Sequence, residues 1–321
     1  MSKILVTGSL GLVGSEAVDF FRAKGWDVVG IDSKMRSQFF GIQQAEPEYN
    51  IDIRDYRALE SLFNEHKFDA IIHTAAQPSH DYSLDEPILD FEVNAKGTLN
   101  LLELTRKYCP EATFVHCSTD KVYGWGMRRK LVEKETRWHS DKPFDEKTKF
   151  EVPYSPFGVS KLASDLYVQE YSTQFGIKAA CFRCGCITGR RHAGAEQHGF
   201  LAYLAKCVKE GIKYKIFGYK GKQVRDLIHS YDLVNAFWHF IQNPKKAKVY
   251  NMGGGEERSV SVLEAISLLE NETGKKAITE YIEKERFGDR QWDVHNVHKF
   301  KKDYPNWDYK CSLADIIKDV S

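Results

Sequence analysis

The sequence predicts an α/β fold in which helices cover both faces of a largely parallel β-sheet. The first observation is an alternation in the first half of the chain, where longer amphipathic stretches separate short apolar runs. The second is a glycine-rich turn that directly follows the first apolar run and leads into a helical pattern. This rhythm is typical of right-handed βαβ crossovers, which build a doubly wound, Rossmann-type sheet.

The expected elements follow one another along the chain. Strands are predicted at 3–7, 27–31, 70–74, 113–118 and 178–183, and helices at 14–24, 56–66 and 91–108. After about residue 183 the pattern is more mixed, with helices expected at 200–210, 231–242 and 261–271. The charged stretch 125–152 has little periodicity, which predicts a solvated loop of the kind that also borders sites.

The turn after the first strand has the composition of a dinucleotide-binding site. Gly8, Gly11 and Gly14 are spaced three residues apart between a strand and a helix. In such turns, glycines permit a tight bend, close backbone approach to a pyrophosphate and close helix packing. The sequence therefore predicts that the turn and the start of the helix, including Leu12 and Val13, bind the cofactor phosphates.

Asp32 ends the second predicted strand, 18 residues after Gly14. A carboxylate there accepts hydrogen bonds from a ribose 2′-hydroxyl and repels a 2′-phosphate, which favours NAD over NADP. Lys34 and Arg36 follow closely and would attract a phosphate, so NADP is the alternative.

Two further segments end predicted strands on the same side of the sheet. We expect Asp52 and Ile53 near the adenine, after a third strand. We expect the segment Thr74, Ala75 and Ala76 near the nicotinamide side of the pyrophosphate. Ordinary turns at the sheet edge are the alternative interpretation of both segments.

Composition argues against several classes of function. The chain carries 46 Lys and Arg against 45 Asp and Glu, and this balance gives no field that would favour nucleic acid. The chain enters its first strand directly and has no apolar span of about 18 residues, so we expect a cytoplasmic protein that does not bind membranes.

Seven irregularly spaced cysteines predict no disulfide framework. Cys181, Cys184 and Cys186 lie on a predicted strand with no second pair nearby, which favours small buried side chains over a zinc site. We therefore predict no metal.

Beyond the glycine-rich turn, several motifs make the chain resemble the extended short-chain dehydrogenases of the NAD-dependent epimerase/dehydratase family. They are residues 7–14, 74–77, 94–98, 118–124, 160–161, 221–229 and 286–290, so the resemblance covers essentially the whole chain. The segments 118–124, 189–191 and 196–200 are most similar to those of the CDP-paratose/CDP-tyvelose 2-epimerases.

The resemblance implies a division into two parts. Residues 1–183 would form the NAD-binding Rossmann domain, to which the chain returns around 224–252. Residues 184–321 would form a smaller, interleaved lobe that binds the nucleotide sugar. With 42% hydrophobic content in 321 residues, the chain can bury both cores.

The resemblance also implies roles for three catalytic positions. Thr119 would hydrogen-bond the sugar oxygen, and Lys161 would contact the nicotinamide ribose. Position 157, four residues before Lys161 and so on the same helix face, carries the family's acid/base tyrosine. In this chain it is Phe157, which has the ring without the hydroxyl.

Further positions are candidates for binding the substrate. Arg225 and Arg290 would clamp a diphosphate, because a guanidinium binds phosphate oxygens in a bidentate manner. The remaining candidates for holding the hexose, each with a structural role as the alternative, are Gln77, Ser79, His80, Arg191, Gln197 and His198. Asp120 and Lys121 occupy positions where sugar 4,6-dehydratases carry an Asp-Glu pair, and the lysine argues against dehydration.

The implied function is NAD-dependent C2 epimerisation of a CDP-hexose through a transient keto-sugar and NADH. The alternatives are a UDP-sugar 4-epimerase and a non-catalytic nucleotide-sugar-binding protein. The implied assembly is a homodimer formed by the helices 91–108 and 155–171.

Phe157 predicts an enzyme that is inactive or strongly slowed, because a positioned base contributes roughly 10²- to 10⁴-fold. We favour an engineered Tyr→Phe replacement as the explanation. The alternatives are a natural binding protein and a natural enzyme with another base. Tyr154 is a poor substitute, since it precedes the predicted helix.

Overall fold

The structure is a computed structural model of the 321-residue chain. It describes residues 1–40, 45–125, 130–152, 154–192, 194 and 199–321. The chain divides into two compact units. The first contains residues 1–122, 155–183 and 233–250, and the second contains residues 123–154, 184–232 and 251–321.

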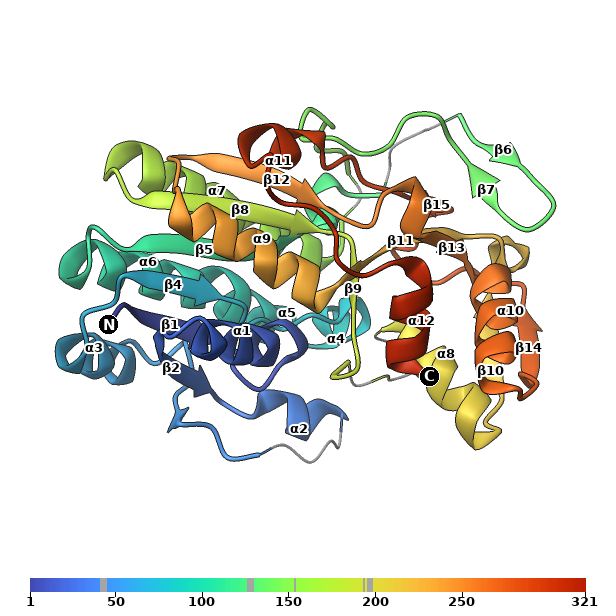
Figure 1. Cartoon of the computed structure of the whole chain (residues 1–321), viewed down its shortest axis with the longest axis horizontal. Helices are drawn as coiled ribbons and strands as arrows, with labels where there is room; N and C mark the ends of the chain where they lie inside the picture. Colours follow the sequence, from blue (N-terminus) through green and yellow to red (C-terminus); the bar gives the residue numbers. More distant parts are fainter. Residues whose placement is uncertain (41–44, 126–129, 153, 193, 195–198) are drawn as a thin grey trace. The chain divides into compact units, whose positions relative to one another are not determined.

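The first unit contains a seven-stranded sheet with the order β12-β8-β5-β4-β1-β2-β3 (Figure 1). Its strands are β1 (Lys3–Thr7), β2 (Asp27–Asp32), β3 (Tyr49–Asn50), β4 (Ala70–His73), β5 (Thr113–Thr119), β8 (Lys178–Cys184) and β12 (Lys248–Met252). The pairs β1–β2, β1–β4, β2–β3 and β4–β5 are parallel. The predicted doubly wound α/β fold is confirmed, and β12 is a strand that the sequence did not predict.

Helices cover both faces of this sheet (Figure 1). They are α1 (Leu12–Ala23), α2 (Met35–Phe40), α3 (Tyr56–Glu65), α4 (His80–Asp85), α5 (Pro87–Phe91), α6 (Gly97–Tyr108), α7 (Pro156–Gln174) and α9 (Ser230–Gln242). On one face, Phe20 and Phe21 of α1 pack against Trp238 of α9. On the other, α6 packs against both α3 and α7 over a common apolar core.

The predicted helix 91–108 is wrong in one respect, because the structure interrupts it. A π-helical turn at Glu92–Lys96 separates α5 from α6. Within this turn, Asn94 is buried and its side-chain amide donates to Gln77 O (3.0 Å) and Asp90 Oδ1 (3.1 Å). Helical periodicity alone could not reveal the π-helical turn, which is wider than an α-helical turn and directs the Asn94 amide into the interior.

The second unit is built around β11 (Val224–His229). This strand pairs in parallel with β9 (Cys186–Thr188) and β15 (Trp292–Asp293), and antiparallel with β13 (Ser259–Ser261). A separate parallel pair joins β10 (Tyr214–Phe217) to β14 (Thr279–Ile282). The helices of this unit are α8 (Phe200–Glu210), α10 (Val262–Thr273), α11 (His298–Asp303) and α12 (Leu313–Val320).

Residues 130–152, the part of the charged stretch 125–152 with continuous description, are more ordered than a simple solvated loop. They contain a short antiparallel pair of β6 (Val132–Glu133) and β7 (Trp138–His139). Arg137, between them in the chain, is held by Glu264 of α10, whose carboxylate lies 2.8 Å from Arg137 Nε. Charged segments are usually solvent-exposed loops, but this one is anchored by the ion pair between Arg137 and Glu264.

The sequence predicted no disulfide framework. In the structure all seven cysteines are free thiols. Among the residues that the structure describes, no helix combines the length and apolar character needed to cross a bilayer.

A buried histidine lies at the carboxyl end of β4. His73 Nε2 is 2.9 Å from Thr98 Oγ1, and His73 Nδ1 is 2.8 Å from Thr7 Oγ1. Thr98 Oγ1 donates its own proton to the Asn94 carbonyl, so it accepts from Nε2–H. Burial, with a smaller effect from the Lys161 charge, lowers the pKa of His73 to about 3, so the ring is neutral near pH 7.

This burial predicts acid-sensitive stability. Between pH 6.5 and about 3 the unfolded chain protonates this histidine and the folded chain does not, so stability falls as the pH falls through this window. At fixed saturating NAD, we expect His73→Asn to flatten the pH dependence of the free energy of unfolding by about 1 kcal/mol per pH unit on average between pH 7 and 5, because the unfolded histidine is only partly protonated above its pKa of about 6.5. Urea denaturation between pH 7 and 5 measures this. The exposed control His298→Asn should keep the wild-type slope, and an unchanged slope in His73→Asn would contradict the prediction.

Candidate active site

The glycine-rich turn of the first unit is too tightly packed to accept side chains. Gly8 has φ +69°, a left-handed conformation that favours glycine, and a Cβ there would lie 2.8 Å from Ala75 N. A Cβ on Gly14 would lie 2.0 Å from Gly8 O. The predicted roles of these glycines in bending the turn and packing the helix therefore match the geometry.

The turn leads into a helix whose first amides have no side-chain cap. Helix α1 begins at Leu12 after the N-cap residue Gly11, and no side chain caps it. No acidic residue lies in its first turn. Uncapped N–H groups and the positive end of the helix dipole together favour an anion, as a bound pyrophosphate requires.

Asp32 connects the end of β2 to this turn. Its Oδ2 accepts the backbone N–H of Leu10 at 3.0 Å, and its Oδ1 accepts that of Lys34 at 2.8 Å. Each carboxylate oxygen keeps a further lone pair for a ribose hydroxyl. Lys34 Nζ is paired with Glu46 at 2.6 Å, which neutralises one of the two cations that could have attracted a 2′-phosphate.

The ends of β1 and β4 are joined directly beside the turn. Thr74 donates from Oγ1 to Thr7 O (2.7 Å), and the N–H of Ala75 donates to Thr7 Oγ1 (3.2 Å). These bonds place the segment that continues into half-buried Ala76 against Gly8, where the sequence predicted cofactor contact.

Asp52 and Ile53 follow β3, as predicted. Burial tends to raise the pKa of Asp52, but its hydrogen bonds to Arg54 outweigh this effect and lower it. The shortest of these contacts joins Arg54 Nη2 to Asp52 Oδ2 at 2.6 Å. Ile53 is buried against Gly97, where a Cβ would lie only 2.5 Å from Ile53 Cδ1. Both residues have clear structural contacts, and their contact with adenine stays a prediction.

Helix α7 carries Phe157 and Lys161 on one face. Both side chains are buried, at 7% and 3% exposure. Lys161 Nζ donates to the carbonyl of Cys117 in β5 at 2.9 Å, which fixes the helix to the carboxyl half of this strand. Thr119 ends the same strand, two residues after Cys117, so the strand that anchors Lys161 also carries Thr119.

Thr119, Asp120 and Lys121 form a small polar cluster. Thr119 Oγ1 donates to Asp120 Oδ1 at 3.2 Å and accepts the backbone N–H of Lys121 at 3.3 Å. Lys121 Nζ pairs with Asp120 Oδ2 at 2.9 Å. The lysine therefore neutralises the carboxylate beside it and supplies no second acidic group.

The sequence offered His80 as a candidate for holding the hexose but did not reveal its contacts at the start of α7. Its ring lies against Phe157, with centroids 5.0 Å apart and planes 70° apart. His80 Nδ1 is 2.7 Å from Ser155 Oγ, which also accepts the N–H of Gly158 as the N-cap of α7. His80 and Ser155 are 75 positions apart in the sequence, which gave no signal of this contact.

Gln77 belongs to a buried hydrogen-bond network. Its Nε2 donates to Asp90 Oδ1 at 2.7 Å and to Ser79 O at 2.9 Å. Ser160 Oγ donates to the other Asp90 oxygen at 2.5 Å. These bonds connect the loop after β4 to α5 and α7, a structural role for Gln77 and Ser79 beside their predicted contact with the hexose.

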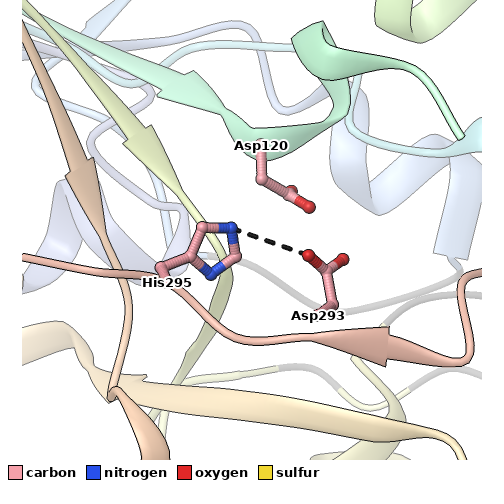
Figure 2. A group of neighbouring side chains, drawn as sticks. All are labelled: Asp120, Asp293 and His295. Carbon is pink, nitrogen blue, oxygen red and sulfur yellow. Dashed lines mark ion pairs between the residues drawn. The ribbon is translucent and has the colours of Figure 1, made fainter. Parts of the chain in front are cut away.

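In the second unit, Arg290 is buried within a chain of polar side chains. Its Nη1 donates to both carboxylate oxygens of Asp293 (2.9 and 3.0 Å), and its Nε donates to Gly124 O (3.0 Å). Asp293 also lies 3.6 Å from His295 Nε2, as the dashed line in Figure 2 marks. His295 Nδ1 in turn lies 2.9 Å from Asp226. These partners orient Arg290, and its contact with a diphosphate stays a prediction.

The other predicted substrate residues of this unit differ in their surroundings. Arg225, on β11, is ion-paired with Asp289. Arg191 is exposed in a turn that follows β9. Gln197 and His198 lie outside the described residues.

Comparison with known proteins identifies the family. The sequence profile of the NAD dependent epimerase/dehydratase family matches residues 4–253. The chain belongs to this family. It is 33% identical over 286 residues to the CDP-paratose 2-epimerase of Salmonella typhi, an alignment that covers 84% of each chain. It is 29% identical to a putative UDP-glucose 4-epimerase of Methanocaldococcus jannaschii, over 99% of this chain and 96% of the relative.

Solved structures show the same fold. The Thermus thermophilus UDP-glucose 4-epimerase in complex with NAD matches with a TM-score of 0.84 and 27% identity, covering 99% of this chain and 97% of that one. The Thermotoga maritima UDP-glucose 4-epimerase with UDP-glucose matches with a TM-score of 0.83 and 28% identity over the same shares. The predicted cofactor is NAD, and the glycine turn, α1 and Asp32 fit it. The chain is thus an NAD-dependent nucleotide-sugar enzyme by family.

The packing of the turn predicts a graded effect on NAD binding. A Cβ on Gly14 would collide with Gly8 O at 2.0 Å, whereas a Cβ on Gly11 would lie 3.1 Å from the same atom. Overpacking costs about 1–3 kcal/mol, so Gly14→Ala should weaken NAD binding roughly 5- to 150-fold. Calorimetric titration of NAD measures this effect. Gly274→Ala, in the second unit where nothing lies within 4 Å of the added Cβ, serves as the control and should change the dissociation constant less than about threefold; equal losses in the two variants would contradict the steric explanation.

Proposed function

We propose that this protein is an NAD-dependent epimerase that inverts C2 of a CDP-hexose of the paratose/tyvelose type. The observation that supports this substrate is the 33% identity to the Salmonella typhi CDP-paratose 2-epimerase over 84% of both chains. The chain's own residues support the reaction class, since Lys161 of α7 bonds the Cys117 carbonyl of β5, the strand that Thr119 ends.

The residues have separate tasks in this proposal. The glycine turn, the start of α1 and Asp32 hold the cofactor. When bound, NAD accepts a hydride from the sugar carbon and later returns it. Thr119 holds the sugar oxygen through its hydroxyl, and Lys161 provides positive potential beside the nicotinamide ribose. Arg225 and Arg290 bind the diphosphate, and Asp289 and Asp293 hold their guanidinium groups before the substrate arrives.

A UDP-sugar 4-epimerase is the second candidate. It is supported by the Methanocaldococcus jannaschii relative, which aligns over 99% of this chain, and by the Thermus thermophilus and Thermotoga maritima structures. A dehydratase is disfavoured, because Lys121 supplies an ammonium where dehydration needs a second acidic group.

Phe157 is the reason to keep a third candidate, a nucleotide-sugar-binding protein without catalysis. Its ring is buried beside His80, so the side chain sits in the site without the hydroxyl that exchanges protons in the family. That Phe157 is an engineered replacement and that the protein is cytoplasmic both stay predictions from the sequence.

We also propose that the protein forms a homodimer. The adjoining helices α4, α5 and α7 expose a group of large apolar side chains, namely Leu84, Ile88, Phe91, Val159, Leu166 and Tyr167. A group of apolar side chains exposed in the single chain is typical of a surface that a protein partner covers. A second copy of the same helices would cover it here. In the predicted helix 91–108, as far as the structure describes it, Phe91 is the one large apolar side chain that is exposed.

Product analysis tests the substrate and the carbon. Phe157→Tyr restores the family's acid/base group, so this variant should convert a CDP-hexose to its C2 epimer, observed by NMR of the sugar ring. UDP-glucose and UDP-galactose serve as competing substrates. Interconversion of the UDP-sugars with no C2 product from any CDP-hexose would favour the 4-epimerase, and tight binding of nucleotide sugars without product from this variant would favour the non-catalytic protein.

The dimer surface predicts a charge-sensitive association. Ile88 is 77% exposed, and burying a lysine there against an apolar partner would leave its ammonium unpaired. Ile88→Lys should raise the dimer dissociation constant at least about 100-fold, measured by sedimentation velocity. Ile278→Lys is the matched control, because Ile278 is 51% exposed in the second unit. A dimer that tolerates the lysine at position 88 would contradict the assignment of this surface.

A further inference from the structure

A buried histidine of the first unit lies directly behind the glycine-rich turn. His73 on β4 is the Cα partner of Thr7 on the neighbouring strand β1 (Figure 1), so both side chains lie on one face of the sheet. Both are buried, His73 at 1% exposure and Thr7 at 0%. Thr7 immediately precedes Gly8, the first glycine of the turn. The imidazole is therefore one side-chain contact from the residue at which the turn begins.

The direction of each hydrogen bond around the ring follows from the groups at its ends. The Asn94 carbonyl can only accept, so Thr98 Oγ1 gives it its single proton at 2.6 Å. Thr98 Oγ1 then accepts from His73 Nε2–H at 2.9 Å, which leaves the lone pair on Nδ1. Thr7 Oγ1 donates to this lone pair at 2.8 Å. Because the proton of Thr7 points at the ring, its oxygen lone pairs face elsewhere, and one of them accepts the N–H of Ala75 at 3.2 Å.

We propose that His73 is a positioning residue for the NAD site. Its imidazole fixes the rotation of the Thr7 hydroxyl, and this hydroxyl holds the backbone of Ala75 against the glycine-rich turn. The role goes beyond the proposed function, because it does not depend on which nucleotide sugar binds or which carbon is inverted. It needs only the cofactor that both candidate epimerases share.

The backbone of Ala75 is in close contact with the turn. A Cβ on Gly8 would lie 2.8 Å from Ala75 N and 2.9 Å from Ala75 Cα. If Ala75 lost its bond to Thr7, NAD binding would have to order this segment as well, and that ordering cost would lower the affinity. His73 thus acts through Thr7 and does not need to touch the cofactor.

His116 provides a matched comparison within the same sheet. It is the Cα partner of His73 on β5, it is fully buried, and the two rings lie 5.3 Å apart. Its Nε2 is 3.2 Å from Ser164 Oγ of α7. Ser164 gives its own proton to the carbonyl of Lys161 at 2.9 Å, so this bond is donated by Nε2–H. The bond of His116 therefore joins β5 to α7, whereas that of His73 reaches the residue before the glycine-rich turn.

The first test titrates full-length His73→Leu and His116→Leu with NAD by calorimetry. Both variants replace a buried imidazole by an apolar side chain of comparable size, so both should lose stability. We expect His73→Leu to raise the NAD dissociation constant roughly 3- to 10-fold, the effect of one hydrogen bond, and His116→Leu to change it less than about twofold. A change below about threefold in His73→Leu, or equal losses in the two variants, would overturn the proposal.

Conservative replacements separate the hydrogen bond from the presence of a ring. The amide oxygen in His73→Asn can take the place of Nδ1 and accept from Thr7, so this variant should bind NAD within about twofold of wild type. If the affinity instead falls with stability in every His73 variant, including His73→Asn, then His73 has a structural role alone and the proposal is wrong.

Thr7 gives a second route to the same bond and keeps the proposal testable if His73→Leu does not fold. Thr7→Val removes the hydroxyl at nearly constant shape and should weaken NAD binding roughly 3- to 10-fold, whereas Thr7→Ser should stay within about twofold. In the Thr7→Val background, His73→Leu should cost less than about twofold more, because the shared bond is already absent. Losses that multiply independently would refute the coupling.

A readout without cofactor titration tests the direction of the bonds. Nitrogen-15 NMR of the labelled full-length protein, with the His73 signals assigned by their loss in His73→Asn, should show Nε2 protonated and Nδ1 unprotonated near neutral pH. Hydrogen exchange of the Ala75 amide should be slow in wild type and faster in His73→Leu and Thr7→Val. A proton on Nδ1 would exclude donation from Thr7 and end the proposal.

The same titrations distinguish failure of this role from failure of the proposed function. If wild type binds NAD and His73→Leu binds it equally well, the role of His73 is overturned and the NAD-dependent epimerase stands. If the full-length chain binds no NAD, the epimerase and the role of His73 are both overturned.

Discussion

The site depends on one buried contact, the hydrogen bond from the Lys161 ammonium to the Cys117 carbonyl. A buried cation is costly unless a partner compensates it, so this bond favours the position of α7 in which Lys161 reaches the carboxyl half of β5. This requirement sets the position of Phe157 one helical turn earlier. It also joins the helix to the strand that Thr119 ends. The catalytic arrangement therefore follows from satisfying a single buried charge.

A second constraint holds the start of α7. Asp90 is fully buried, and burial raises its pKa although hydrogen bonds from Ser160 and Gln77 oppose the effect. Losing one of these donors would leave the buried carboxyl group incompletely satisfied. The network thus keeps the loop after β4 against α7, and this loop ends at His80. The hydrogen bonds of Asp90 are structural, yet they help to position the His80 ring against Phe157.

The sequence revealed the parts of the fold that follow a regular period. The glycine turn, Asp32 and the strands of the sheet could be predicted because their residue types or alternation encode local geometry. The break in helix 91–108 could not, since its cause is Asn94, whose amide bonds Gln77 and Asp90 in the interior. For the same reason the contact of His80 with Ser155 was not foreseen. Tertiary hydrogen bonds leave no periodic trace in the chain.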